Sequence, residues 1–381
     1  MNILFVCTSN PLETDNGSVQ RTNVLWCALR KIGTVYTVVL RREGDAEITD
    51  EENRIRTAFV YRNGIVGKIQ SLLWTHFHKP TVWAFTSPFL RRNPWRNVKF
   101  DWAVCRYIEP MAASRAWKIA PVAVDIDDWT PQTHATVYNP KCAWWRRRAA
   151  QWAVDRWCEY FVRKCTAAWL PNPGHLPMVE RLGVKATLLP NLAMPPRAGY
   201  SRHGRQRPML LTVGLMSHLP NHEGVAWFLD NFWPALHKRF PQLEYAIAGK
   251  DMPQKLQERC NATPGVKYMG FVEDIDALYE EAIAVAAPIL SGSGTCIKVI
   301  EAALHGRFTF ATPFAARGIA QDDMERLGIV PIDTLAGRLE DMMAGKDIER
   351  MQESIAAAAE VYNSRTAFEQ RVHDVLRTAA S

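Results

Sequence analysis

The sequence has 381 residues and no long apolar run. The longest stretches, such as Ile283 to Leu290, fall far short of the roughly 20 residues that a membrane-spanning helix needs. Met1 to Cys7 is apolar but has no basic flank before it, and acidic residues follow soon after. This pattern predicts a buried first strand and not a signal peptide. We therefore expect the protein to stay in the cytoplasm.

The eight cysteines are scattered, without a Cys-x-x-Cys pair or a zinc-like ladder. A disulfide framework is not expected in so large a chain, so the pattern favours free buried thiols. The pair His76 and His78 is too isolated for a structural zinc site, which takes four ligands. We expect no metal and no cofactor.

A nicotinamide-binding turn is also missing, because the loop from Thr8 to Gly17 lacks Gly-x-Gly-x-x-Gly spacing. This argues against a dehydrogenase. The net charge of +7 admits nucleic acid, an anionic membrane or a phosphorylated substrate, and composition alone does not choose among them. No recognised DNA or RNA module is present, so we expect no nucleic-acid partner.

Strand and helix patterns alternate through most of the chain. The predicted strands cover residues 2–7, 35–40, 102–105, 122–126, 167–170, 209–213, 245–248, 266–269, 283–288 and 308–311. The clearest helices cover residues 19–29, 225–236 and 295–305, and further helices follow from about residue 335. This order predicts two doubly wound α/β sheets.

A segment rich in proline and glycine, residues 190–207, marks the expected domain linker. We predict an N-terminal Rossmann-like domain over residues 1–200 and a C-terminal one over 201–361. A C-terminal helix at about 362–381 should pack back on the first domain.

The segment from Ser291 to Ala302 is the most informative one, since it follows a buried strand and opens a helix. Gly292 and Gly294 let the backbone approach an anion, and a helix start favours negative charge. Lys298 adds a positive charge, and Glu301 shares its helix face. This suits a nucleotide, with diphosphate at the helix start and ribose hydroxyls on the carboxylate. The same residues also fit an ordinary capped helix with a surface ion pair.

This segment resembles the donor-binding motif of GT-B glycosyltransferases of family GT4, in the variant with a Gly-Ser-Gly-Thr loop, a lysine and a single glutamate. The resemblance extends over most of the chain and is strongest from Leu210 to Gly318. Further matching features are Asn16-Gly17 with Arg21, Gly214-Leu-Met216, Pro220-Asn221, Trp227-Phe228, Trp233-Pro234, Gly249 and Gly270-Phe271-Val272.

The resemblance implies two Rossmann-like domains that face an interdomain cleft. It also implies a metal-independent, retaining transfer of a sugar from a nucleotide-diphosphate sugar to a glycan or lipid-linked acceptor, in surface polysaccharide assembly. The donor-binding residues it implies are Gly17, Gly214, Asn221, Lys250, Phe271, Gly292, Ser293, Gly294, Thr295, Lys298 and Glu301.

The sequence departs from the family at three places. Ser293 stands where many members carry a first glutamate, and Ser217 to Asn221 lacks the usual Arg and Lys. The run from Arg106 to Pro110 lacks the histidine found before Glu-Pro in some members. Arg106, Glu109 and Asp127 become the catalytic candidates. The alternatives are a GT-B protein that only binds its ligand and a basic nucleic-acid-binding protein.

Asp125, Asp127 and Asp128 lie at or just past a predicted inner strand. A carboxylate cluster there can orient acceptor hydroxyls, or stabilise a developing oxocarbenium charge. It can equally cap a helix. Asp125 and Asp128 are our candidates for acceptor binding.

The stretch from Lys141 to Cys165 combines tryptophans with arginines. As a helix it fits interfacial binding to an anionic membrane. It also fits a helix whose tryptophans belong to the core and whose arginines form a solvated face.

Overall fold

The computed structural model describes residues 1–13, 17–61, 93–138, 143–203, 206–345 and 348–378. Asn16, His76, His78, Lys141 and Cys142, which the sequence analysis considered, lie outside these ranges. The chain divides into two compact units. Unit 1 comprises residues 1–190 with 365–381, and unit 2 comprises residues 191–364.

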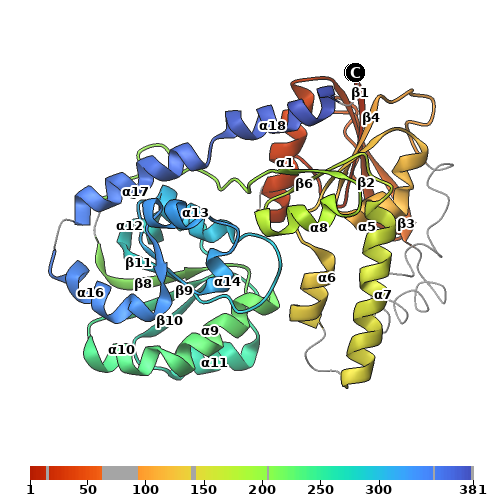
Figure 1. Cartoon of the computed structure of the whole chain (residues 1–381). Helices are drawn as coiled ribbons and strands as arrows, with labels where there is room; N and C mark the ends of the chain where they lie inside the picture. Colours follow the sequence, from red (N-terminus) through yellow and green to blue (C-terminus); the bar gives the residue numbers. More distant parts are fainter. Residues whose placement is uncertain (14–16, 62–92, 139–142, 204–205, 346–347, 379–381) are drawn as a thin grey trace. The chain divides into compact units, whose positions relative to one another are not determined.

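Unit 1 is built on a parallel sheet with the described strand order β3-β2-β1-β4-β5-β6-β7 (Figure 1). Its strands are β1 (Asn2–Cys7), β2 (Thr34–Arg42), β3 (Ile55–Tyr61), β4 (Trp102–Arg106), β5 (Val122–Asp125), β6 (Ala167–Leu170) and β7 (Lys185–Leu188). Its α-helices are α1 (Gly17–Arg30), α5 (Ile108–Ser114), α6 (Thr130–Thr133), α7 (Trp144–Val162), α8 (Leu176–Glu180) and α18 (Arg365–Thr378). Shorter turns are η1 (Ala116–Lys118), η2 (His134–Tyr138) and η3 (Pro173–His175).

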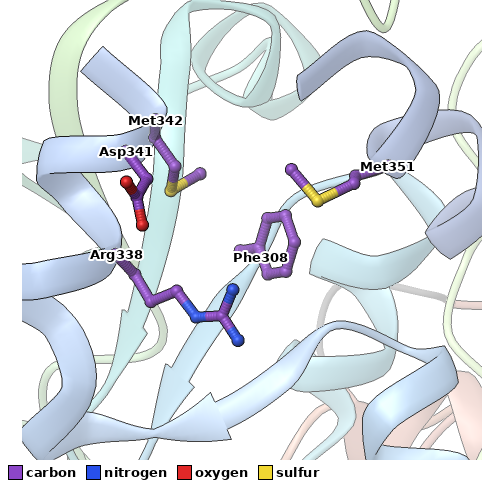
Figure 2. A pocket seen from close by; sticks show the side chains of 5 residues that line it. All are labelled: Phe308, Arg338, Asp341, Met342 and Met351. Carbon is purple, nitrogen blue, oxygen red and sulfur yellow. The ribbon is translucent and has the colours of Figure 1, made fainter. Parts of the chain in front are cut away.

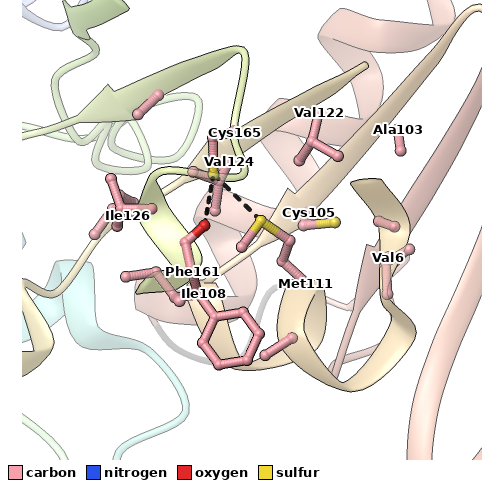
Figure 3. Close-up of a cluster of buried hydrophobic side chains, with 14 of the residues drawn as sticks. Val6, Ala103, Cys105, Ile108, Met111, Val122, Val124, Ile126, Phe161 and Cys165 are labelled. Carbon is pink, nitrogen blue, oxygen red and sulfur yellow. Dashed lines mark hydrogen bonds between the residues drawn. The ribbon is translucent and has the colours of Figure 1, made fainter. Parts of the chain in front are cut away.

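Successive residues of each buried strand point to opposite faces of this sheet, so both faces carry apolar side chains. Helices cover both faces. One face packs with α5, α7 and α8 in a cluster that includes Val124, Met111 and Phe161 (Figure 3). On the other face, Trp26 of α1 donates its indole N–H to Thr37 Oγ1 over 3.1 Å. The C-terminal helix α18 packs against α1 within unit 1.

Unit 2 repeats this plan, with the described strand order β10-β9-β8-β11-β12-β13, all parallel. Its strands are β8 (Arg207–Val213), β9 (Glu244–Ala248), β10 (Val266–Gly270), β11 (Ala282–Ala287), β12 (Thr309–Ala311) and β13 (Ile329–Pro331). Its helices are α9 (Leu219–Asn231), α10 (Trp233–Arg239), α11 (Gln254–Ala262), α12 (Ile275–Glu281), α13 (Ile297–Leu304), α14 (Pro313–Ala316), α15 (Gln321–Arg326), η4 (Ile332–Thr334), α16 (Leu335–Met343) and α17 (Ile348–Tyr362).

Both faces of the second sheet are also covered. Leu210 and Ile247 point into a cluster with α9, α10 and α16, whereas Leu211 and Ala248 pack with α12 and α13. The two doubly wound, Rossmann-like sheets confirm the predicted fold class.

Each sheet has one point at which the strand order reverses. It falls between β1 and β4 in unit 1 and between β8 and β11 in unit 2. Ligands of open α/β sheets bind at the carboxyl ends of the strands beside such a point. The loops after these four strands are therefore the first places to look for a site.

The single helix predicted over residues 225–236 is wrong. The structure has two helices, α9 and α10, with a break at Phe232. Pro234 occupies the first turn of α10. A proline inside a continuous helix would remove a hydrogen bond and clash with the preceding turn, so the chain restarts instead.

A pair of helical glycines gives a matched test of this fold. A Cβ on Gly224 in α9 would lie 2.0 Å from the Pro288 carbonyl oxygen, whereas a Cβ on Gly337 in α16 would meet nothing within 4 Å. We expect Gly224→Ala to destabilise the protein by about 1–3 kcal/mol through the clash. Gly337→Ala should stabilise it by about 0.5–1 kcal/mol through helix propensity.

Urea unfolding of both variants beside the wild type measures the two changes. Equal effects of the same sign would show that α9 does not pack against the strand end as described.

Candidate functional site

Gly214, Asn221 and Lys298 meet at the carboxyl end of β8, beside the reversal point of unit 2. The Lys298 ammonium donates to Asn221 Oδ1 over 2.7 Å, and Asn221 Nδ2 donates to the Leu215 carbonyl over 2.8 Å. A Cβ on Gly214 would lie 2.9 Å from both Lys298 Nζ and Asn221 Nδ2. The missing side chain at Gly214 is therefore what lets the lysine and the amide reach the strand end.

The backbone that follows β9 packs closely against Gly214. Gly249 follows β9 with a φ of +146°, and a Cβ there would lie 1.7 Å from the Gly214 carbonyl oxygen. Lys250 accepts a hydrogen bond from the Met216 amide through its carbonyl oxygen, over 2.9 Å. Its side chain lies over the Phe271 ring at 5.8 Å, and that ring is 72% exposed. Lys250 and Phe271 thus form an exposed pair at the ends of β9 and β10.

The loop before α13 is held by a residue outside the predicted set. Arg317 donates through Nε to the carbonyls of Gly294 and Ser293, over 2.8 and 3.3 Å. Gly292 has a φ of +117°, which favours glycine, and a Cβ there would lie 3.1 Å from Arg317 Nη2. Thr295 Oγ1 accepts from the Asn191 amide over 2.8 Å.

Helix α13 begins at Ile297, later than predicted, and carries Lys298 and Glu301 on one face. Val299, Ile300 and Leu304 are buried, and the half-buried Ile297 packs against the same cluster. Burial lowers the pKa of Lys298. Burial and the nearby Asp276 charge raise the pKa of Glu301 to about 7.

A buried histidine lies one turn beyond Glu301. His305 Nδ1 lies 2.7 Å from the Glu301 carbonyl oxygen, and Nε2 lies 2.7 Å from Asp276 Oδ1. Burial lowers the pKa of His305. These two contacts link the end of α13 to α12.

The raised pKa of Glu301 determines how this residue changes the stability of the folded protein with pH. The folded protein binds this proton more tightly than the unfolded chain does. The resulting stabilisation is full below pH 4.5, the ordinary pKa, and is lost as pH rises through about 7. We expect Glu301→Gln to be more stable than wild type at pH 8, by about 1–2 kcal/mol after solvent screening, and no more stable at pH 4.5.

Thermal unfolding across this pH range checks the prediction. Glu325→Gln, at an exposed position of α15, is the control and should change little at any pH. A Glu301→Gln advantage that persists unchanged into acid would contradict the assigned pKa.

Unit 1 has its own polar cluster at the carboxyl ends of β4 and β5, made of two arginines and two aspartates. Asp125 is fully buried and accepts from Arg21 Nη2 at 2.6 Å and Nε at 2.9 Å. Arg106, 1% exposed, lies 3.1 Å from Asp125 and donates to Asp127 Oδ2 over 2.8 Å. Burial alone would lower the pKa of Arg106, but Tyr107, Asp125 and Asp127 outweigh it and raise that pKa.

Tyr107 also belongs to this cluster and was absent from the predicted set. Its φ of +73° is a strained backbone conformation for a bulky residue. The ring lies 4.2 Å from the Arg106 guanidinium, and the hydroxyl lies 2.8 Å from Ser18 Oγ. Such strain persists only where the surroundings enforce it, and it gathers at functional sites.

The other predicted residues of unit 1 are spread around this cluster. Gly17 is the first residue of α1, and Glu109 is half-buried in the first turn of α5. Asp128 is exposed, whereas Asp127 keeps 12% of its side chain accessible. Asp125 has no exposed surface, so it acts as an ion-pair partner of the buried arginines. Asp127 and Asp128 are the carboxylates of this cluster that solvent reaches.

Asp125→Asn should therefore destabilise unit 1 strongly. The change leaves Arg21 and Arg106 buried without their shared counter-charge, a loss of about 3–5 kcal/mol. Asp128→Asn, three residues away and exposed, should change stability by less than about 0.5 kcal/mol. Denaturant unfolding measures both, and similar small losses would mean that Asp125 is not the centre of the ion pairs.

A hollow elsewhere in unit 2 contains none of the predicted residues. Figure 2 shows its lining, which is Phe308, Arg338, Asp341, Met342 and Met351. These side chains come from α16, α17 and the residue before β12, and the space of about 20 Å³ is too small for a nucleotide.

In the described part of the chain, no cluster of three or more His, Cys, Asp or Glu side chains is arranged to hold a metal ion. Among the helices described, none combines the length and apolar character that a bilayer crossing requires.

Solved structures of known proteins share the fold over nearly the whole chain. Sucrose-phosphate synthase from Thermosynechococcus elongatus superposes with a TM-score of 0.71 at 14% identity, covering 100% of this chain and 99% of that one. Anabaena HepE in complex with UDP and glucose gives 0.64 at 12% identity, covering 99% and 100%. A UDP-forming α,α-trehalose-phosphate synthase from Burkholderia vietnamiensis gives 0.65 at 12% identity, covering 100% and 97%.

The fold is therefore that of the GT-B glycosyltransferases. Residues 207–344, which lie within unit 2, match the family model described as glycosyl transferases group 1. No curated protein sequence gives a significant match. The matched segment contains the Gly214, Asn221 and Lys298 contacts.

Proposed function

We propose that this protein is a glycosyltransferase that uses a nucleoside-diphosphate sugar bound by unit 2. It transfers the sugar, with retention of configuration and without a metal, to a glycan or a lipid-linked saccharide. The group 1 match over residues 207–344 supports the reaction class. Assembly of surface polysaccharide on the cytoplasmic side is the role we infer from the family resemblance.

The observation that carries the proposal is the placement of Lys298. Its ammonium group lies at the end of β8, where Gly214 has no side chain to block access to the backbone. The neutral amide of Asn221 orients the ammonium group. A diphosphate there would gain charge-assisted hydrogen bonds, and the start of α13 favours the same negative charge. This arrangement stabilises a diphosphate leaving group with the protein's own charges.

Glu301 is the residue we assign to the ribose. Its carboxylate follows Lys298 by one turn and can accept from two vicinal hydroxyl groups. Because burial has raised its pKa to about 7, donor binding should favour the ionised form. Gly292 to Thr295 would lie along the phosphates, held in shape by Arg317.

Unit 1 supplies the residues that we assign to the acceptor. Asp127 is oriented by Arg106 and still reaches solvent, so it can accept from a sugar hydroxyl or face a developing positive charge. Asp128 extends the same carboxylate edge. Arg106 and Asp125 then act as positioning residues, because their groups are engaged within the buried cluster.

Lys298→Ala should separate phosphate binding from nucleoside binding. UDP is a suitable probe, since the structurally similar HepE was solved with UDP. We expect Lys298→Ala to weaken UDP about 10- to 100-fold, the loss of one charge-assisted contact, and uridine less than about threefold. Calorimetry with and without a chelator measures both, and Lys255→Ala on the exposed face of α11 is the control.

Catalysis itself is tested with a panel of uridine, guanosine and adenosine diphosphate sugars, followed by proton NMR. The released sugar should first appear with the donor's anomeric configuration, more than tenfold faster with wild type than with Lys298→Ala. Release of the opposite anomer would refute retention. UDP binding without turnover of any donor would favour a binding protein with the GT-B fold.

A further inference from the structure

The exposed face of α7 is the most unusual surface of unit 1. The buried side chains of this helix, Val154, Trp157, Cys158, Phe161 and Val162, all come from its second half. Residues 143–149 are exposed without interruption. In Figure 1 this first half of α7, in yellow, extends away from the sheet of unit 1. Packing therefore stabilises only one end of the helix, and such projecting turns are marginal in water.

Aromatic side chains stand on this exposed face. Trp144, Trp145 and Trp152 are 71%, 55% and 65% exposed, and Tyr160 is 48% exposed. Trp157 is the tryptophan of α7 that joins the core, at 5%. Trp145 and Trp152 are seven residues apart, so they lie on the same side of the helix. The interpretation in which the tryptophans of this stretch belong to the core is therefore wrong for three of the four.

Positive charge lies between these rings. From Trp144 to Lys164 the chain has six basic and two acidic residues. Arg146, Arg147 and Arg148 occupy the first two turns of α7, where the helix dipole disfavours cations. The Arg146 guanidinium lies 5.0 Å from the Trp145 ring, so charge and aromatic surface are presented together. The pattern is unfavourable for an isolated helix end, and an anionic partner would relieve it.

We propose that the exposed face of α7 docks on an anionic lipid bilayer. Tryptophan and tyrosine prefer the headgroup level of a membrane, and arginines beside them attract acidic headgroups. Rings interleaved with guanidinium groups suit this layered environment better than a continuous apolar patch would. The helix lies on the bilayer and does not cross it. This inference does not depend on the proposed function, since none of these residues belongs to the donor site.

Vesicle sedimentation of the full chain tests the proposal. Wild-type protein should sediment with phosphatidylglycerol vesicles at low salt, stay in solution with phosphatidylcholine vesicles, and be released as salt rises. Arg146→Gln, Arg147→Gln and Arg148→Gln combined should weaken binding at least tenfold. Trp145→Ala with Trp152→Ala should do the same with the charge unchanged. All these positions are exposed, so the melting temperature should stay the same.

A charge-matched control separates this face from net charge. Lys255→Gln, Arg326→Gln and Arg350→Gln remove three exposed cations from unit 2 and should bind vesicles as wild type does. Equal losses in both triple variants would overturn the proposal, as would wild-type protein that ignores anionic vesicles or is retained by RNA alone. UDP affinity should be unchanged in every variant. A loss of vesicle binding is therefore distinguishable from a loss of donor binding.

Discussion

The close approach of Lys298 to the end of β8 is the constraint on which the candidate site depends. The ammonium group reaches Asn221 only because Gly214 has no side chain, and Gly214 keeps its place because Gly249 has none either. Gly214, Gly249 and Lys298 are far apart in the sequence, and all three are needed to hold the ammonium group at the end of β8. We propose that a strand end, a helix start and two glycines together form one anion-binding surface at the reversal point of the sheet.

Burial of charge has different consequences in the two units. In unit 1, Arg21, Asp125, Arg106 and Asp127 compensate one another, so the cluster holds the strand ends in place and leaves Asp127 as its accessible edge. In unit 2, burial works against the charges of both Lys298 and Glu301. A bound diphosphate and ribose would relieve part of that cost. This is why we assign the first cluster chiefly to structure and the second to the ligand.

Sequence patterns predicted the buried strands well, because continuous apolar runs such as Asn2–Cys7 and Ala167–Leu170 have few other ways to fold. They missed β3 (Ile55–Tyr61), β7 (Lys185–Leu188) and β13 (Ile329–Pro331), which lie at sheet edges and have few buried residues. They also ran α9 and α10 together, although Pro234 gives the signal for a restart. The motif from Ser291 to Ala302 led to Lys298 and Glu301. Local patterns could not predict the roles of Arg317, Tyr107 and the His305–Asp276 pair. These roles depend on contacts between distant segments or on backbone strain.

A crystal structure of the protein with UDP would show whether unit 2 binds the nucleotide as proposed. We expect the diphosphate within hydrogen-bond distance of Lys298 Nζ and of the loop from Gly292 to Thr295, with the ribose hydroxyls on the Glu301 carboxylate. Asn221 should keep its contact with Lys298, and Gly214 should stay in van der Waals reach of the phosphate. A UDP molecule bound elsewhere, or one at the end of β8 whose ribose points away from Glu301, would contradict the proposal.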